Sequence, residues 1–213
     1  MNKPLKDIAF KAYLDGDVKF EFCRELNILF DYTHEEKDWD ILFFDQPLVL
    51  ANLISQLEEK SLLLGILQTA KDFKLLIKKH PSDHASKYTG LYVNLLQCAN
   101  IPWEVIYLNE YVKNELNLQN KIYITYTSSA MLNTRIIFKD LDTNSCFITL
   151  SKLLKNVSDG FRQDKATERF FEKFKELYGK NFYEVKSFEE LEHVFNELSL
   201  VNKTIYASTE IGD

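Results

Sequence analysis

Short apolar runs recur along the chain and alternate with stretches of helical periodicity. Five of them have the length and the Ile, Phe and Tyr content of buried strands: ILFF (41–44), FKLLI (73–77), EVIYL (104–108), KIYITYT (121–127) and CFITL (146–150). Strands that alternate with helices are typical of βαβ units, whose parallel sheet is buried on both faces. We therefore predict an α/β protein in which a Rossmann-like parallel sheet is flanked by helices.

Polar residues stand where several of the expected helices would begin. Leucines recur at helical spacing over 52–64, between the first two strands. Asn109 would cap a helix over 110–116, because Asn is among the preferred N-cap residues. Ser128 and Ser129 follow the fourth expected strand and would open another helix.

The last part of the chain has the spacing of amphipathic helices. Phe170, Phe171 and Phe174 recur on one helical face, and Ser187 with Glu190 forms the pattern of a capping box. We therefore expect three parts: a remnant or linker over 1–40, a Rossmann-like domain over 41–160, and a helical C-terminal extension over 161–213.

The charge and composition of the chain argue against several classes of protein. The net charge of -6 argues against nucleic-acid binding, which needs a dominant basic face. Cys23, Cys98 and Cys146 are too widely spaced for a disulfide framework or a zinc knuckle, which favours a reducing cytoplasm. No apolar run reaches the length that spans a bilayer, so we expect a cytoplasmic protein with at most a peripheral membrane contact.

Polar motifs follow two of the expected strands. Ligands of parallel sheets bind at the carboxyl ends of the strands, so His80 and Pro81 are expected to lie at the ligand-binding edge. A histidine can donate a proton or a hydrogen bond to a phosphate leaving group, and Lys78 and Lys79 would attract the anion. The alternative is an ordinary loop histidine beside solvated lysines.

The pair Ser128-Ser129 is expected at the same edge. Two hydroxyls and the free N–H groups at a helix start can bind phosphate. A plain N-cap is the alternative, since Ser is one of the commonest caps.

An acidic element, YLDGD (13–17), precedes the first strand. Asp15 or Asp17 could act as a general base if it faced an attacking hydroxyl. Asp-Gly is equally a turn pattern.

Taken together and in this order, the motifs YLDGD, LFFDQPL (42–48), LLIKKHP (75–81), IPWEVIYL (101–108) and YTSSAML (126–132) resemble the bacterial sialyltransferases. The likeness is to the lipooligosaccharide enzymes of glycosyltransferase family 52, with the capsule polysialyltransferases as relatives. It implies a GT-B glycosyltransferase that transfers sialic acid from CMP-sialic acid to a cell-surface glycan, with inversion and without a metal or other cofactor.

The resemblance also implies roles for individual residues. Asp15 would be a carboxylate of the base motif, and His80 would hydrogen-bond or protonate the departing phosphate. Ser128 and Ser129 would hold that phosphate, and Gln46 stands in a matching position after the first strand. The implied partners are a nucleotide-sugar donor and a glycan acceptor, with a homo-oligomer and a contact at the cytoplasmic face of the inner membrane also expected.

Two departures from the family keep a second interpretation open. The family places two acidic residues before the glycine, and the first of these positions is Leu14 here. Few residues precede this motif, so the chain resembles the C-terminal, nucleotide-binding half of these enzymes. The alternatives are a non-catalytic domain that binds CMP, a nucleotide sugar or a partner chain, and a related transferase with another nucleotide donor.

Overall fold

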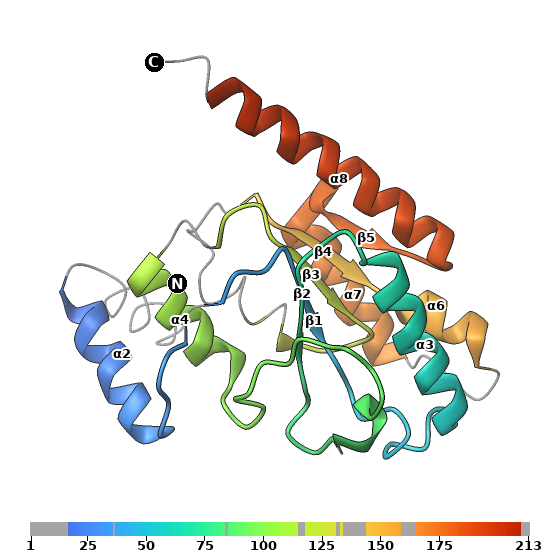
Figure 1. Ribbon diagram of the computed structural model, residues 1–213, viewed down its shortest axis with the longest axis horizontal. Coiled ribbons are helices and arrows are strands. Elements are labelled where there is room, and N and C mark those ends of the chain that lie inside the picture. The colour runs from blue at the N-terminus through green and yellow to red at the C-terminus, as the bar shows by residue number, and fades with distance from the viewer. Residues whose placement is uncertain are drawn as a thin grey trace, which may run out of the picture.

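The computed structural model describes residues 17–35, 37–83, 85–114, 118–130, 133, 144–158 and 165–209. These residues form a parallel β-sheet between helices (Figure 1). In chain order the elements are α2 (Val18–Leu29), β1 (Ile41–Phe44), α3 (Gln56–Thr69), β2 (Leu75–Lys78), the 3-10 helix η1 (Ala85–Tyr88), α4 (Trp103–Asn114), β3 (Ile122–Thr125), β4 (Cys146–Thr149), α6 (Ser151–Val157), α7 (Lys165–Tyr178), the 3-10 helix η3 (Gly179–Asn181), β5 (Phe182–Glu184) and α8 (Phe188–Thr209).

The sheet has the strand order β2-β1-β3-β4-β5, and every neighbouring pair is parallel. The chain moves outward from β1 to β2, then crosses back over β1 to β3 and continues in that direction. The predicted α/β fold with a Rossmann-like parallel sheet is therefore confirmed. A sheet of this order has its topological switch point between β1 and β3.

Each face of the sheet packs against its own set of helices. Ile41, Phe43 and Ile77 belong to a core that includes residues of α3, α6 and α8. Leu42 and Phe44 point the other way, into an aromatic-rich core with residues of α2, α4 and α7. Figure 1 shows the sheet between α2 and α4 on its left and α3 and α6 on its right. Burial on both faces explains why the strands are continuous apolar runs.

The expected strand over 104–108 is wrong, because these residues lie inside helix α4. Pro102 precedes the helix, and its carbonyl oxygen accepts hydrogen bonds from the N–H groups of Val105 (3.1 Å) and Ile106 (3.4 Å). Every residue from Val105 to Glu110 is buried, because the sheet covers one side of α4 and α2 covers another. A helix buried on most sides is apolar along its length and has the same local pattern as a buried strand.

Asn109 does not cap a helix, in contrast to the prediction. It is buried within α4, where its side chain donates to the carbonyl oxygen of Val105 (2.9 Å) and pairs with the side chain of Asn27 on α2 (2.8 Å). This amide pair satisfies buried polar groups and fixes α2 against α4.

The other predicted elements have small differences in their bounds. Strand 41–44 is β1, while 73–77, 121–127 and 146–150 correspond to β2, β3 and β4. Helix α3 begins at Gln56, four residues after the start of the leucine pattern, and follows a capping box in which the side chains of Ser55 and Glu58 each accept the other residue's backbone N–H. Most of the helix expected after Ser129 lies outside the described residues.

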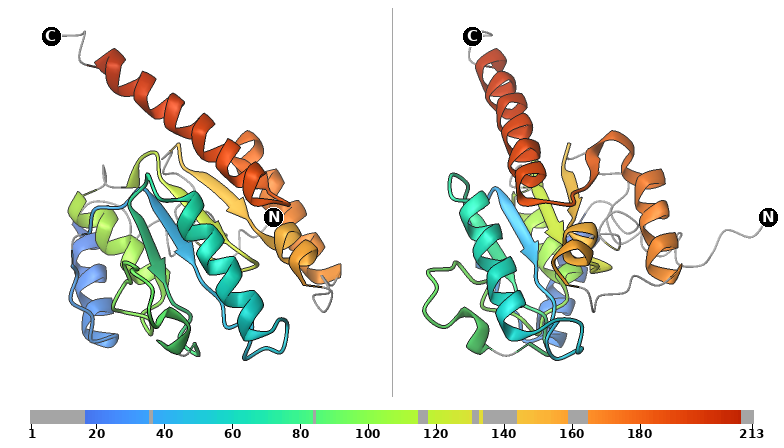
Figure 2. Two further views of the ribbon diagram at one scale, coloured as in Figure 1. Left: turned by 45° about the vertical axis from the view of Figure 1, so that its right-hand side comes forward. Right: turned by 90° about the vertical axis from the view of Figure 1, so that its right-hand side faces the viewer.

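Residues 161–213 contain the expected helices, α7 and α8, and also a strand that the sequence pattern does not predict. Strand β5 has three residues and pairs with β4 at the edge of the sheet. The hydroxyl of Ser187 accepts the N–H of Glu190 at the start of α8 (3.2 Å). Helix α8 runs from the sheet toward the C-terminus and projects away from the other elements (Figures 1 and 2).

None of the helices in the described ranges combines the length and the apolar character needed to cross a membrane.

Candidate functional site at the carboxyl edge of the sheet

The loops that carry the predicted motifs leave the sheet at the same level. Strands β1, β2 and β3 are paired so that their last residues are in register. Gln46, His80 and Thr127 each follow two residues after the end of one of these strands. The predicted placement of both motifs at the carboxyl edge is therefore correct, and the Ser128-Ser129 pair follows the third strand rather than the fourth.

Gln46 joins the loops on the two sides of the switch point. Its side-chain oxygen accepts hydrogen bonds from the backbone N–H of Thr127 (2.6 Å) and from the hydroxyl of the same residue (3.2 Å). The N–H of Gln46 in turn donates to the carboxylate of Asp45 (2.8 Å). The hydrogen bonds between Gln46 and Thr127 therefore lie at the switch point, where doubly wound sheets bind their ligands.

Buried threonines at the last positions of β3 and β4 hold this edge together. The hydroxyl of Thr125 donates to the carbonyl oxygen of Phe44 (3.3 Å) and accepts the N–H of Ser128 (2.9 Å). The hydroxyl of Thr149 donates to the carbonyl oxygen of Tyr126 (2.8 Å). Each hydroxyl therefore ties the end of its own strand to the neighbouring strand or to the loop that follows.

His80 is exposed on the loop after β2. The N–H of Ser82 donates to its Nδ1 atom (3.2 Å), and the N–H of Asp83 donates to its carbonyl oxygen (3.0 Å). A ring nitrogen that accepts a hydrogen bond carries no proton, so the neutral ring has its proton on Nε2. That N–H is suited to donate to an anionic oxygen. Pro81 is exposed beside it.

The two lysines before His80 differ in their surroundings. Lys78 is only 7% exposed, and its ammonium donates to the carbonyl oxygen of Ala99 (3.2 Å). Burial lowers the pKa of Lys78. Lys79 is partly exposed. The structure therefore leaves Lys79 available at the loop and directs Lys78 toward the segment before α4.

The serine pair also divides into two environments. The hydroxyl of Ser128 accepts the N–H of Ala130 (3.2 Å), which is the geometry of a short polar cap. Ser129 is exposed, and its carbonyl oxygen accepts the N–H of Asn133 (2.9 Å). The hydroxyl of Ser128 is thus engaged within its own turn, and the exposed hydroxyl at this edge is that of Ser129.

The candidate base motif is only partly within the described residues. Leu14 and Asp15 lie outside the described residues. Asp17, the second acidic residue of the motif, immediately precedes helix α2 and is exposed.

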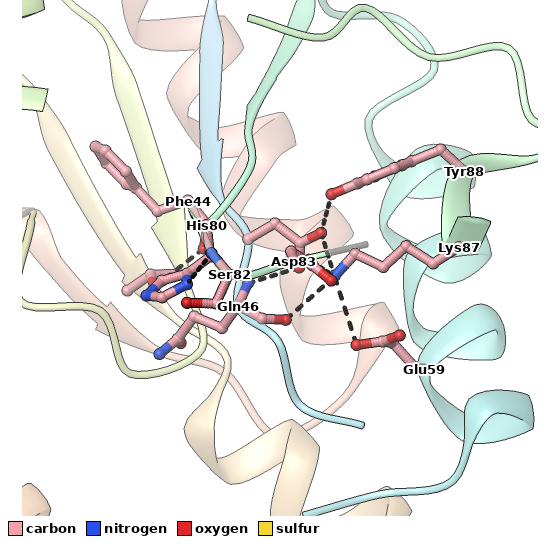
Figure 3. A network of polar contacts seen from close by, with 10 residues as sticks. Phe44, Gln46, Glu59, His80, Ser82, Asp83, Lys87 and Tyr88 are labelled. Carbon is pink, nitrogen blue, oxygen red and sulfur yellow. Dashed lines mark hydrogen bonds and ion pairs between the residues drawn. The ribbon is translucent and has the colours of Figure 1, made fainter. Parts of the chain in front are cut away.

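A buried ionic cluster lies next to the His80 loop, and sequence reasoning missed it (Figure 3). The ammonium of Lys87 pairs with Asp45 (2.8 Å), Glu59 (3.4 Å) and Asp83, and each of these four side chains is at most 9% exposed. The hydroxyl of Tyr88 donates to the carboxylate of Asp45. We call these five residues the Lys87 cluster.

Burial and neighbouring charges shift the pKa values of Asp45, Glu59 and Lys87. Burial raises the pKa of Asp45 and that of Glu59, although Lys87 opposes the shift in both. Burial alone would lower the pKa of Lys87, but Asp45 and Asp83 beside it raise it above its ordinary value. The ammonium therefore stays charged, and Asp45 and Glu59 hold protons more tightly than free carboxylates do.

Only the spacing of Asp83 and Lys87 hints at this cluster in the sequence. The two residues are four positions apart, as in a helical ion pair. Asp45 and Glu59 come from β1 and α3, and nothing in the local pattern distinguishes them from solvated charges.

Two hollows lie outside the switch point. A cavity of about 540 Å³ is bordered by Glu59, Asp83 and Lys87 and by residues of the loop before α3. A groove of about 630 Å³ runs between α2 and α4. Among the described residues, no group of three or more His, Cys, Asp or Glu side chains is arranged to hold a metal ion.

Comparison with known proteins adds no assignment. No protein-family model matches this chain, and no curated protein matches it significantly.

Proposed function

We propose that this protein binds the phosphate of a CMP-activated sugar at the switch point between β1 and β3. The observation that carries the proposal is the common level of Gln46, His80 and Thr127 beyond strands that end in register. A doubly wound sheet binds its ligands in that crevice. The histidine and the serine pair, which resemble the sialyltransferase motifs, both lie on this edge.

The proposed reaction is transfer of sialic acid, with inversion, from CMP-sialic acid to a cell-surface glycan. The acceptor hydroxyl forms a C–O bond with the sugar and gives its proton to a base, a role that the resemblance assigns to Asp15. The C–O bond between the sugar and the phosphate breaks, and negative charge develops on the phosphate. The Nε2–H group of His80 would donate to that oxygen. The hydroxyl of Ser129 and the ammonium of Lys79 would bind the remaining phosphate oxygens.

Calorimetric titration with CMP, UMP and GDP tests the binding step. We expect the protein to bind CMP more tightly than the other two nucleotides. His80→Ala should weaken CMP binding by about tenfold or more, because one hydrogen bond to a charged group is lost. His193→Ala is the matched control, since His193 is exposed on α8 and its side chain is 74% accessible. Absence of CMP binding, or equal effects of both substitutions, contradicts the proposal.

A second candidate function is a binding domain without catalysis. It is favoured by Leu14, which stands where the resemblance calls for the first acidic residue. Incubation with CMP-sialic acid separates the two candidates, with release of CMP as the readout. Release that is abolished by Asp15→Ala supports a transferase. Tight binding of CMP without release supports the binding domain.

A further inference from the structure

The Lys87 cluster connects the His80 loop to the sheet and to helix α3. Lys87 and Asp83 belong to the segment that follows β2, Asp45 directly follows β1, and Glu59 lies in the first turns of α3. The ammonium of Lys87 also donates to the carbonyl oxygen of Gln46 (3.1 Å). One side chain therefore contacts the residues after β1, helix α3 and the loop after β2.

Stability alone does not account for such a cluster. Taking charges out of water costs free energy, and buried ion pairs often stabilise a protein no more than apolar residues of similar size. Here three buried carboxylates surround one ammonium. In some proteins buried ionic groups select one arrangement of the chain.

In this protein the Lys87 cluster is connected to the turn that carries His80. The N–H groups of Ser82 and Asp83 bind the ring and the carbonyl oxygen of His80, which makes 80–83 a compact turn. The carboxylate of Asp83 continues from this turn to Lys87, and Lys87 continues to Asp45. The imidazole ring is therefore linked to the end of β1 through the backbone of Ser82 and Asp83 and then through the ion pairs of Lys87 (Figure 3).

We propose that Lys87 is a positioning residue that holds the His80 loop in the orientation required for ligand binding. Lys87 does not itself contact the ligand. Its effect on binding rests on the function proposed above, whereas its effect on the loop is a property of the fold alone. The two effects are measured separately.

Hydrogen exchange of the Ser82 and Asp83 amides tests the effect on the loop. We expect Lys87→Met to speed exchange of these two amides by about tenfold or more, because the turn is no longer tied to β1 and α3. Lys71→Met serves as the control, since Lys71 is exposed after α3, and should leave exchange unchanged. Lys87→Arg should restore much of the protection, because a guanidinium can pair with the same carboxylates.

Asp83→Asn tests the same connection in a milder way. It removes the ion pair between Asp83 and Lys87 and leaves Lys87 paired with Asp45 and Glu59, so the fold is retained even if Lys87→Met does not fold. We expect faster exchange over 80–83 with a thermal midpoint close to that of the wild type. Unchanged exchange in Asp83→Asn, or equal loss in Lys87→Met and Lys87→Arg, overturns the proposal.

CMP titration of the same variants tests the effect on binding. We expect Asp83→Asn to weaken CMP binding by about tenfold. If the wild type binds no nucleotide, the proposed function fails, while the exchange measurement still decides whether Lys87 positions the loop. If the wild type binds CMP and Asp83→Asn binds it equally well despite a loosened loop, the positioning role fails and the binding function stands.

Discussion

The side-chain oxygen of Gln46 lies 2.6 Å from the backbone nitrogen of Thr127 and accepts its hydrogen bond. The two residues are 81 positions apart in sequence, yet both follow the strands that border the switch point. This contact places the loop with Ser128 and Ser129 relative to β1. The loops after β1 and β3 are therefore held together at the carboxyl edge of the sheet.

Gln46 offers a test that separates structure from ligand binding. Gln46→Ala removes the acceptor for Thr127 and should lower the free energy of unfolding by about 1 kcal/mol. Gln46→Glu retains an acceptor at that position and should cost less stability, but its negative charge should weaken CMP binding more than Gln46→Ala does. Denaturant unfolding and calorimetry of both variants provide the measurement. The prediction fails if the Gln46→Glu variant binds CMP as tightly as the Gln46→Ala variant does.

Thr125 is expected to stabilise the edge through its hydroxyl. Thr125→Val preserves the shape of the side chain but leaves the N–H of Ser128 without its acceptor. We expect a loss of about 1–3 kcal/mol in the free energy of unfolding, since the partly buried N–H of Ser128 loses its partner. Thr33→Val is the control, because Thr33 is exposed, and should change stability by less than about 0.5 kcal/mol. Similar losses in both variants would show that the hydroxyl of Thr125 has no special role.

Glu59 should make stability depend on pH. Because burial raises its pKa above the usual 4.5, the folded protein binds a proton at Glu59 more tightly than the unfolded chain. The resulting stabilisation is complete below the usual pKa and is lost as the pH rises through the raised value. Glu59→Gln removes this dependence, so its thermal midpoint should fall less than that of the wild type between mildly acid and neutral pH.

The measurement for Glu59 is a series of thermal unfolding curves across this pH range. Glu58→Gln is the matched control on the preceding residue, because hydrogen bonds with Ser55 lower the pKa of Glu58. Its contribution has the opposite sign, since a lowered pKa adds stability above the usual value. A steeper fall in Glu59→Gln than in the wild type is the outcome that contradicts the prediction.

Gly65 should resist replacement by alanine although it lies inside helix α3. Alanine is favoured over glycine in a helix interior by about 1 kcal/mol. At Gly65, however, a Cβ atom would lie 2.2 Å from the ring of Phe188 on α8. We expect Gly65→Ala to lower the free energy of unfolding by about 1–3 kcal/mol, because the ring has to move.

The clash at Gly65 predicts a dependence on the partner side chain. In a Phe188→Leu background the same glycine-to-alanine change should be neutral or stabilising, because the smaller side chain leaves room for the methyl group. A double-mutant cycle measures the difference. If Gly65→Ala has equal effects in both backgrounds, the loss of stability does not come from the contact with Phe188.

Much of the fold follows from local pattern, and the exceptions have a common cause. Strand β1 matches its predicted bounds, and β2, β3 and β4 differ from theirs by a few residues. The segment 104–108 forms a helix because α4 is enclosed by the sheet and α2, and enclosure removes the polar face that marks a helix. Strand β5 was missed because its three residues are too few for a periodic pattern.

The sequence by itself determined the alternation of strands and helices, and with it a parallel sheet that carries His80 and Ser129 on one edge. Periodicity and strand ends are local properties, so a single chain reveals them. Only the tertiary structure decided which polar groups meet. The Gln46–Thr127 contact, the burial of Lys78 and the assembly of Asp45, Glu59 and Asp83 around Lys87 depend on the order in which the strands pack. Those contacts join residues distant in sequence, and no local pattern encodes their distances or their burial.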